Sequence, residues 1–296
     1  MVFGWTQDDG ATNAGPAPLF TEEENMKVPI QNFAHALTDQ DYSQLFSLYL
    51  ASDFQQEVAS YEARKTEADP VAPVHWFRVS RILRDVLFTC SSIDFGYEMS
   101  RQSRSLDPSF TGVRLYDLNQ SMLTPLFEVV GMPYIGAPHG SDYNYVTNGV
   151  FPEGQVSDND RALAESVATS FIHFAYTGDP TILNDKNFGS WPEAFSEGQG
   201  LKDGMESEAA GPSIMNIQLI GGPLGTGPTP LGVEPDSHEL GGQEDEGSMQ
   251  IPLGFGGIEF GELQTAAFNA RKRELEREKL LKRCAFINTL SNKLDI

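Results

Sequence analysis

The sequence has few cysteines, few positive charges and no long apolar run. Its two cysteines, Cys90 and Cys284, are too few for a disulfide framework, and because both lie in apolar helical patterns we predict buried free thiols. Twenty lysines and arginines face 42 aspartates and glutamates, and the net charge of -22 argues against nucleic acid and anionic membranes as partners. No apolar run reaches the length of a membrane span.

Metal-binding and targeting signals are also missing. The five histidines are scattered, and none has a cysteine, histidine or carboxylate neighbour at ligand spacing, so the sequence predicts no metal site and implies no cofactor. Residues 1–10 lack the basic and apolar parts of a signal peptide, which leaves the localisation unknown. Residues 2–4 resemble the end of a buried strand, and we therefore expect either a fragment of a longer fold or a gene model that begins too late.

The segment from Val74 to about Met99 has the clearest periodicity. Its apolar residues recur three and four positions apart, which predicts a surface helix with one buried face. Arg81, Arg84 and Asp85 lie off this apolar stripe. The stripe consists of Val79, Ile82, Leu83, Val86, Leu87 and Cys90.

Other segments indicate both helices and a strand. Residues 22–50 contain two short helical patterns, with Thr38 and Asp39 as suitable N-caps of the second. Residues 112–118 alternate apolar and polar side chains as a strand does, and residues 157–160 begin another helix. Strand, loop and helix in this order, with long connections, predict the α/β class.

Composition divides the chain into three parts. Residues 1–195 carry the helical and strand patterns, residues 196–260 form an irregular acidic stretch rich in glycine and proline, and residues 261–296 form a C-terminal helix. Within the irregular stretch, we interpret the acidic cluster at 241–247 as a solvated loop rather than a cation site.

The C-terminal helix is predicted to be amphipathic. Leu280, Cys284 and Ile287 form its apolar stripe, and Glu278 and Lys282 are spaced as an i,i+4 ion pair.

One histidine, His139, has the surroundings expected of a catalytic base. It lies in a loop at 136–143, where the flanking glycines permit a tight turn and close approach of the backbone. Ester hydrolysis by a serine requires an imidazole to accept the hydroxyl proton and a carboxylate to orient that imidazole. The other histidines lie in helical patterns or in the acidic stretch. From the residues alone, His139 is either a base or a solvent-exposed loop residue.

Several segments resemble one family. Residues 136–146 are similar to the histidine block of type-B carboxylesterases, cholinesterases and fungal lipases, which are α/β-hydrolases. Residues 171–180, ending in Phe-Ala-Tyr-Thr-Gly-Asp-Pro, resemble a helix end of that family, and Trp-Pro follows at 191–192. Residues 4–10 resemble the turn that holds the catalytic acid. The resemblance extends from residue 4 to about residue 193, and parts of the tail look like the C-terminal extension of fungal members.

The resemblance implies a fold and a set of roles. The chain would be the C-terminal part of an α/β-hydrolase, with helices packed on a partial sheet. Asp9 would be the catalytic acid and His139 the base. Asp8 is the alternative acid, although the family acid directly precedes the glycine, which favours Asp9. Asp142 matches an acidic position whose role looks structural.

The nucleophile of the family is missing from this sequence. No Gly-x-Ser-x-Gly motif occurs, and neither does the glycine-rich loop that supplies oxyanion donors. The sequence therefore predicts a truncated and inactive fragment of an enzyme that acts on small-molecule esters. Its expected partner is the N-terminal half of the same fold. The alternative is a non-catalytic, cholinesterase-like interaction protein.

Overall fold

The computed structural model describes residues 1–149, 156–196, 214–232 and 262–294. A mixed sheet forms its centre. Strands β1 (Val2–Thr6), β2 (Arg114–Leu118) and β4 (Ile214–Ile220) are parallel to one another in that order. The two-residue β3 (Phe195–Ser196) and the longer β5 (Gly227–Gly232) pair antiparallel with β4. Strand β1 lies at one edge of the sheet and pairs only with β2 among the described strands.

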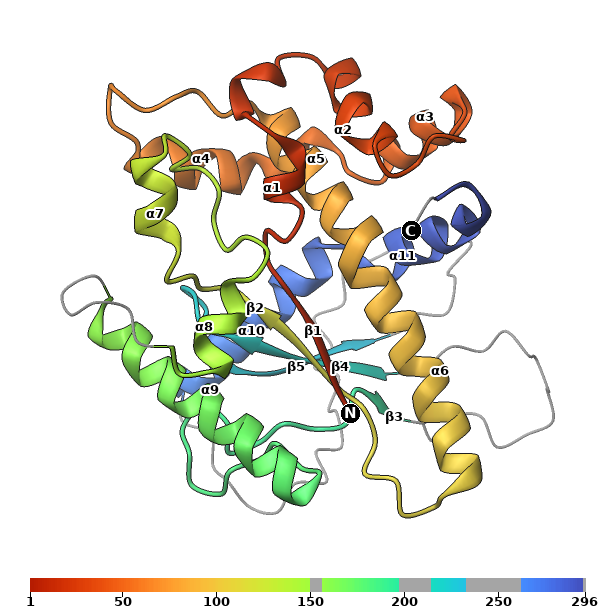
Figure 1. Cartoon of the computed structure of the whole chain (residues 1–296), viewed down its shortest axis with the longest axis vertical. Coiled ribbons are helices and arrows are strands. Elements are labelled where there is room, and N and C mark those ends of the chain that lie inside the picture. The colour runs from red at the N-terminus through yellow and green to blue at the C-terminus, as the bar shows by residue number, and fades with distance from the viewer. Residues whose placement is uncertain (150–155, 197–213, 233–261, 295–296) are drawn as a thin grey trace.

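Helices cover both faces of this sheet (Figure 1). On one face, Leu115 of β2 and Ile217 of β4 belong to the same buried cluster as residues of a long helical segment (residues 74–106) and of α11 (Leu280–Thr289). On the other face, α9 (Asp158–Thr177) covers Tyr116 and Leu118. Neighbouring residues of a strand point to opposite faces, so β2 is buried on both of them. This three-layer arrangement confirms the predicted α/β class.

Burial on both faces explains why strand β2 departs from its predicted pattern. The alternation at 112–118 predicted one polar face, but all five residues of the strand are buried. Arg114 is accommodated by donating hydrogen bonds to the carbonyl oxygens of Trp191 (2.9 Å) and Thr111 (2.7 Å). Asp117 is buried within the same strand.

The long helical segment has three parts. The helix α5 (Val74–Arg84) continues through the π-helical turn η4 (Asp85–Thr89) into α6 (Cys90–Leu106). The prediction of a surface helix with one buried face is wrong for its first half, because Arg81, Arg84 and Asp85 are all buried. These charges pair with groups on other elements that local periodicity does not reveal.

Shorter helices surround this framework. Thr38 caps α3 (Asp39–Ser47), with its hydroxyl accepting a hydrogen bond from the Asp41 amide at 3.3 Å, and Ser157 caps α9, as predicted. Gly178 ends α9 with a φ of 77°. The remaining α-helices are α1 (Ala11–Ala14), α2 (Lys27–Gln31), α3 (Asp39–Ser47), α4 (Gln55–Arg64), α7 (Thr124–Val129), α8 (Ser141–Val146) and α10 (Glu262–Arg277). The 3₁₀ turns are η1 (Ala17–Leu19), η2 (Glu23–Met26), η3 (Ala51–Phe54) and η5 (Ser291–Lys293).

The C-terminal third corrects two predictions. The stretch at 196–260 was expected to be irregular, but β4 and β5 lie within it, because alternate residues of β4 enter the core beside β2. The predicted C-terminal helix is two helices, α10 and α11, which are separated where Lys279 adopts a φ of 49°. The acidic cluster at 241–247 lies outside the described residues.

The prediction that the two cysteines are free thiols is wrong. Cys90, at the start of α6, forms a disulfide with Cys284 of α11. Both are buried, as expected, but the tertiary fold brings them together across 194 positions of sequence. Among the described residues, no helix is long and apolar enough to span a bilayer.

Candidate active site

The turn after β1 holds Asp9 in a fixed position. Its Oδ2 accepts a hydrogen bond from the Thr6 amide at 3.1 Å, and the residue is only 4% exposed. Gly10 then passes directly over α5. A β-carbon at Gly10 would lie 2.1 Å from the Ser80 carbonyl oxygen and 2.4 Å from the Arg84 nitrogen, so only glycine fits. The close packing of this turn on α5 fixes where the carboxylate points.

The histidine loop depends on glycine at two positions. Gly136 has a φ of 72° and Gly140 a φ of 82°, in the left-handed region that glycine adopts without strain. Gly140 also precedes α8, which begins at Ser141. The Ser141 hydroxyl closes the loop by donating to the Pro138 carbonyl oxygen at 2.6 Å. His139 therefore projects from a tight turn braced on both sides.

The structure brings Asp9 and His139 together. The His139 Nδ1 and the Asp9 Oδ1 are 2.6 Å apart, although the residues are 130 positions apart in the sequence. The acid is buried, whereas the histidine side chain is 60% exposed. With Nδ1 bonded to a carboxylate, Nε2 is the ring nitrogen that remains to accept a proton. This is the arrangement that a general base requires.

Asp8, the alternative acid, has a different role. Its Oδ2 accepts a hydrogen bond from the Ala137 amide at 2.9 Å, and its own amide donates to the Ala137 carbonyl oxygen at 3.0 Å. A β-carbon at Gly136 would lie 2.0 Å from the same Asp8 oxygen. Asp8 thus joins the acid turn to the histidine loop, and the carboxylate that contacts the His139 ring is that of Asp9.

Asp142 supports the site from the first turn of α8. Its Oδ2 accepts a hydrogen bond from the Tyr116 hydroxyl at 2.9 Å. Because Tyr116 belongs to β2, this bond anchors the end of the histidine loop to the sheet. That geometry is consistent with the structural role expected for Asp142.

Burial shapes the electrostatics of the acid turn. Desolvation raises the pKa of Asp9, while hydrogen bonds from Thr6 and His139 oppose that rise and the charge of Asp142 adds to it. Desolvation also raises the pKa of Asp8, against the opposing charge of Arg81. The His139 contact therefore favours the ionised form of Asp9 against the cost of its burial.

An aromatic ring covers one face of the His139 imidazole. The rings of Phe88 and His139 stack with their centroids 4.7 Å apart and an interplanar angle of 21°. Phe88 belongs to the π-helical turn η4. Sequence reasoning missed this contact, because the periodicity of an α-helix does not reveal where a π-helical turn directs its side chains.

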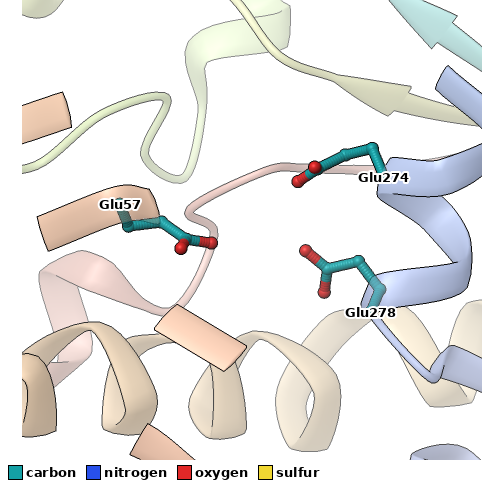
Figure 2. A group of neighbouring side chains, drawn as sticks. All are labelled: Glu57, Glu274 and Glu278. Carbon is teal, nitrogen blue, oxygen red and sulfur yellow. The ribbon is translucent and has the colours of Figure 1, made fainter. Parts of the chain in front are cut away.

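A second group of acidic side chains consists of three carboxylates (Figure 2). Glu57 comes from α4, Glu274 from α10, and Glu278 lies one residue beyond α10. Their oxygens are close enough to hold a metal ion. Arginines already pair with them, however. Arg277 contacts Glu57 at 2.8 Å and Glu274 at 2.5 Å, and Arg81 pairs with Glu278.

The pairing of these carboxylates with arginine fits a structural network better than a metal centre. Glu278 also contacts Arg84 at 3.1 Å and Arg283 at 3.3 Å. Gln7, two residues before Asp9, donates a hydrogen bond to Glu278 at 3.2 Å. The network therefore ties the C-terminal helices to α5 and to the acid turn. Glu278 does not form the predicted surface pair with Lys282, because it points into this network.

A polar cavity of about 310 Å³ opens beside the histidine loop. Gln7, Asp8, Ser121, Gly136 and Ala137 are among its lining residues, whereas Asp9 and His139 are not. Within the described residues, no serine hydroxyl forms a hydrogen bond with His139. The hydroxyls of Ser121 and Ser141 bond to each other at 2.8 Å. Among the described residues, the Asp9–His139 pair thus has no serine hydroxyl in contact with it.

Known proteins resemble this chain over most of its length. The family described as "Carboxylesterase family" matches residues 1–208. An inactive carboxylesterase-like protein, VdtD of Byssochlamys spectabilis, is 26% identical over 207 residues, which are 69% of this chain and 33% of that protein. The crystal structure of EstA from Aspergillus niger aligns with 100% of this chain, and the aligned part is 40% of EstA. The TM-score is 0.51 and the sequence identity 14%, so the two share a fold. The chain spans only about a third of the curated relative it matches.

Proposed function

This chain belongs to the carboxylesterase family, and we propose that it supplies the acid and base of a serine-type ester-hydrolysing site whose nucleophile lies outside it. The observation that carries the proposal is the 2.6 Å contact between Asp9 Oδ1 and His139 Nδ1. Proton abstraction from a hydroxyl requires a carboxylate on one ring nitrogen and a second nitrogen free to accept the proton, and the His139 side chain is largely exposed.

In this mechanism, Asp9 accepts a hydrogen bond from Nδ1–H and holds the imidazole in the tautomer whose Nε2 is unprotonated. Nε2 removes the proton from a serine hydroxyl as that oxygen attacks the ester carbonyl carbon. The resulting imidazolium is stabilised by Asp9 and then returns the proton to the departing alcohol, which leaves an acyl-serine. A water molecule, deprotonated in the same way by His139, hydrolyses the acyl group. The substrate class is a small-molecule carboxylic ester.

The partner we propose is the N-terminal half of the same fold. Strand β1 has a described neighbour on one edge only, so its other edge has backbone groups available to a further parallel strand. The chain spans 40% of EstA and 33% of its curated relative, and the remainder of such a fold would supply that strand, the serine and the oxyanion donors. By itself the chain would be inactive.

Hydrolysis of p-nitrophenyl acetate by the purified chain tests this proposal, with His139→Ala as the matched variant. We expect the two proteins to give the same background rate. Turnover by the wild-type chain that His139→Ala abolishes would show that the nucleophile lies within these residues. Sequencing the transcript upstream of the Met1 codon tests the partner, because an in-frame Gly-x-Ser-x-Gly motif is expected there.

The second candidate is a non-catalytic interaction protein. It is favoured by the relative from Byssochlamys spectabilis, which is described as inactive. The two candidates differ in what they require of the site, because an interaction protein has no need of an aligned acid and base. A stop codon directly upstream of Met1, together with an unchanged background rate, would support this second candidate over the first.

A further inference from the structure

Two neighbouring side chains contact the exposed His139 ring. The Asp9 carboxylate fixes the Nδ1 edge of the His139 ring, and Phe88 covers one face of it. The side chain is nevertheless 60% exposed. A single hydrogen bond leaves an exposed ring free to pivot about that bond, whereas a stacked neighbour restricts the tilt of the ring plane.

The π-helical turn is what places Phe88 against this ring. In η4 the Cys90 amide donates to the Asp85 carbonyl oxygen, five residues earlier. This wider turn changes the angular position of the residues within it relative to a regular α-helix. Thr89 is fully buried and Leu87 only partly, although the α-helical stripe predicted Leu87 on the buried face. The change leaves Phe88 half-buried beside the histidine loop.

The turn itself has firm supports on both sides. Before Phe88, Asp85 is buried and its carboxylate contacts the Arg84 guanidinium at 2.6 Å and accepts a hydrogen bond from the Tyr49 hydroxyl at 2.7 Å. After Phe88, Cys90 is bonded covalently to Cys284 of α11. The Phe88 side chain therefore extends from a segment whose backbone is anchored at each end.

We propose that Phe88 is a positioning residue for His139. Its ring keeps the imidazole in the plane in which Nδ1 bonds to Asp9, and so keeps Nε2 directed at the reacting hydroxyl. When the imidazole is protonated, the π face of Phe88 also lies against a cation, which is a favourable electrostatic contact. The inference rests on the proposed function of the Asp9–His139 pair and adds a residue to it.

The test is the rate at which the His139 Nδ1–H proton exchanges with water, measured by proton NMR on the full chain. This proton exchanges only when its bond to Asp9 opens. In Phe88→Leu, we expect exchange about 2- to 10-fold faster, the factor that corresponds to the strength of an aromatic stack. Phe88→Tyr retains a ring and should restore the wild-type rate.

A matched control comes from the same helical segment. Phe95 of α6 contacts Phe3 edge-on at 5.6 Å and is exposed, so Phe95→Leu removes a ring of the same size away from the site. It should leave the Nδ1–H exchange rate unchanged. Equal exchange rates in Phe88→Leu and the wild type, or an equal acceleration in Phe95→Leu, would overturn the inference.

A second measurement needs no variant. Relaxation of the His139 ring carbons in the wild-type chain should give an order parameter near that of rigid backbone, about 0.85, despite the exposure of the side chain. A freely moving ring that still retains the Asp9 bond would refute the role of Phe88 while leaving the acid–base proposal intact. Absence of any Asp9-bonded Nδ1 proton would instead contradict the proposed function itself.

Discussion

Cys90 and Cys284 form a disulfide that closes a loop of 194 positions and joins α11 to the helix that carries Phe88. The C-terminal segment that contains α10 and α11 is thus linked to α5 and α6 by a covalent bond as well as by the ion pairs of Glu278. Disulfides form and persist in oxidising compartments, so this bond requires an oxidising environment to be maintained.

The disulfide makes stability dependent on the redox state. Because it closes a long loop, its loss in Cys90→Ser/Cys284→Ser should lower the free energy of unfolding by about 2–5 kcal/mol, measured by urea denaturation. Reductant should destabilise the wild type to a similar degree and leave the double variant unaffected. Alkylation of both thiols in the folded chain without reductant would show that the bond does not form.

The two candidate acids can be separated by matched substitutions. Asp9→Asn replaces the charged acceptor of the Nδ1–H bond by a neutral amide, so the low-field proton signal of that bond should disappear. Asp8→Asn should keep the signal, because Asp8 contacts the loop backbone rather than the ring. Proton NMR near neutral pH measures both. If the signal were lost in Asp8→Asn and kept in Asp9→Asn, the carboxylate bonded to His139 would be that of Asp8, contrary to this prediction.

Glu278 should be far more sensitive to substitution than its surface neighbours. Glu278→Gln leaves Arg81 and Arg84 without their shared carboxylate in a buried setting, and we expect a loss of about 3–5 kcal/mol in unfolding free energy. Lys282→Gln is the control, since Lys282 is exposed, and its effect should stay within about 0.5 kcal/mol. Similar effects of the two substitutions would favour the surface pair that the sequence alone predicted.

Asp117 should make stability depend on pH. Burial raises its pKa from 3.8 to about 7, with the charges of Arg84 and Arg81 opposing the rise. Between pH 3.8 and pH 7, Asp117 holds a proton in the folded state that it has lost in the unfolded chain. The contribution of Asp117 to the free energy of unfolding therefore falls as the pH rises towards 7.

Asp117→Asn removes that titration. The stability of the variant relative to the wild type should therefore increase between pH 5 and pH 8, by about 3 kcal/mol for two units of pKa. Urea denaturation of both proteins at the two pH values measures the change. Parallel pH profiles of the variant and the wild type would mean that Asp117 does not titrate in this range.

The sequence by itself determined the features that depend on nearby residues. Thr38 and Ser157 cap their helices through side chains that reach amides only three positions away. The glycines beside His139 permit its turn wherever the loop lies, and the spacing of Leu280, Cys284 and Ile287 describes a real buried stripe. The family resemblance placed Asp9 and His139 in one site, which neither residue indicates locally.

The tertiary structure decided whatever depends on contacts between distant segments. Arg81 and Arg84 are buried because Glu278 and Asp85 compensate their charges, and the two cysteines are paired because α11 packs on α6. Strand β4 forms inside a polar stretch because the edge of β2 is available to pair with it. Phe88 meets His139 through a π-helical turn held by groups from other elements. Periodicity along a sequence specifies one face of an element, whereas the burial of its other faces depends on partners that only the fold supplies.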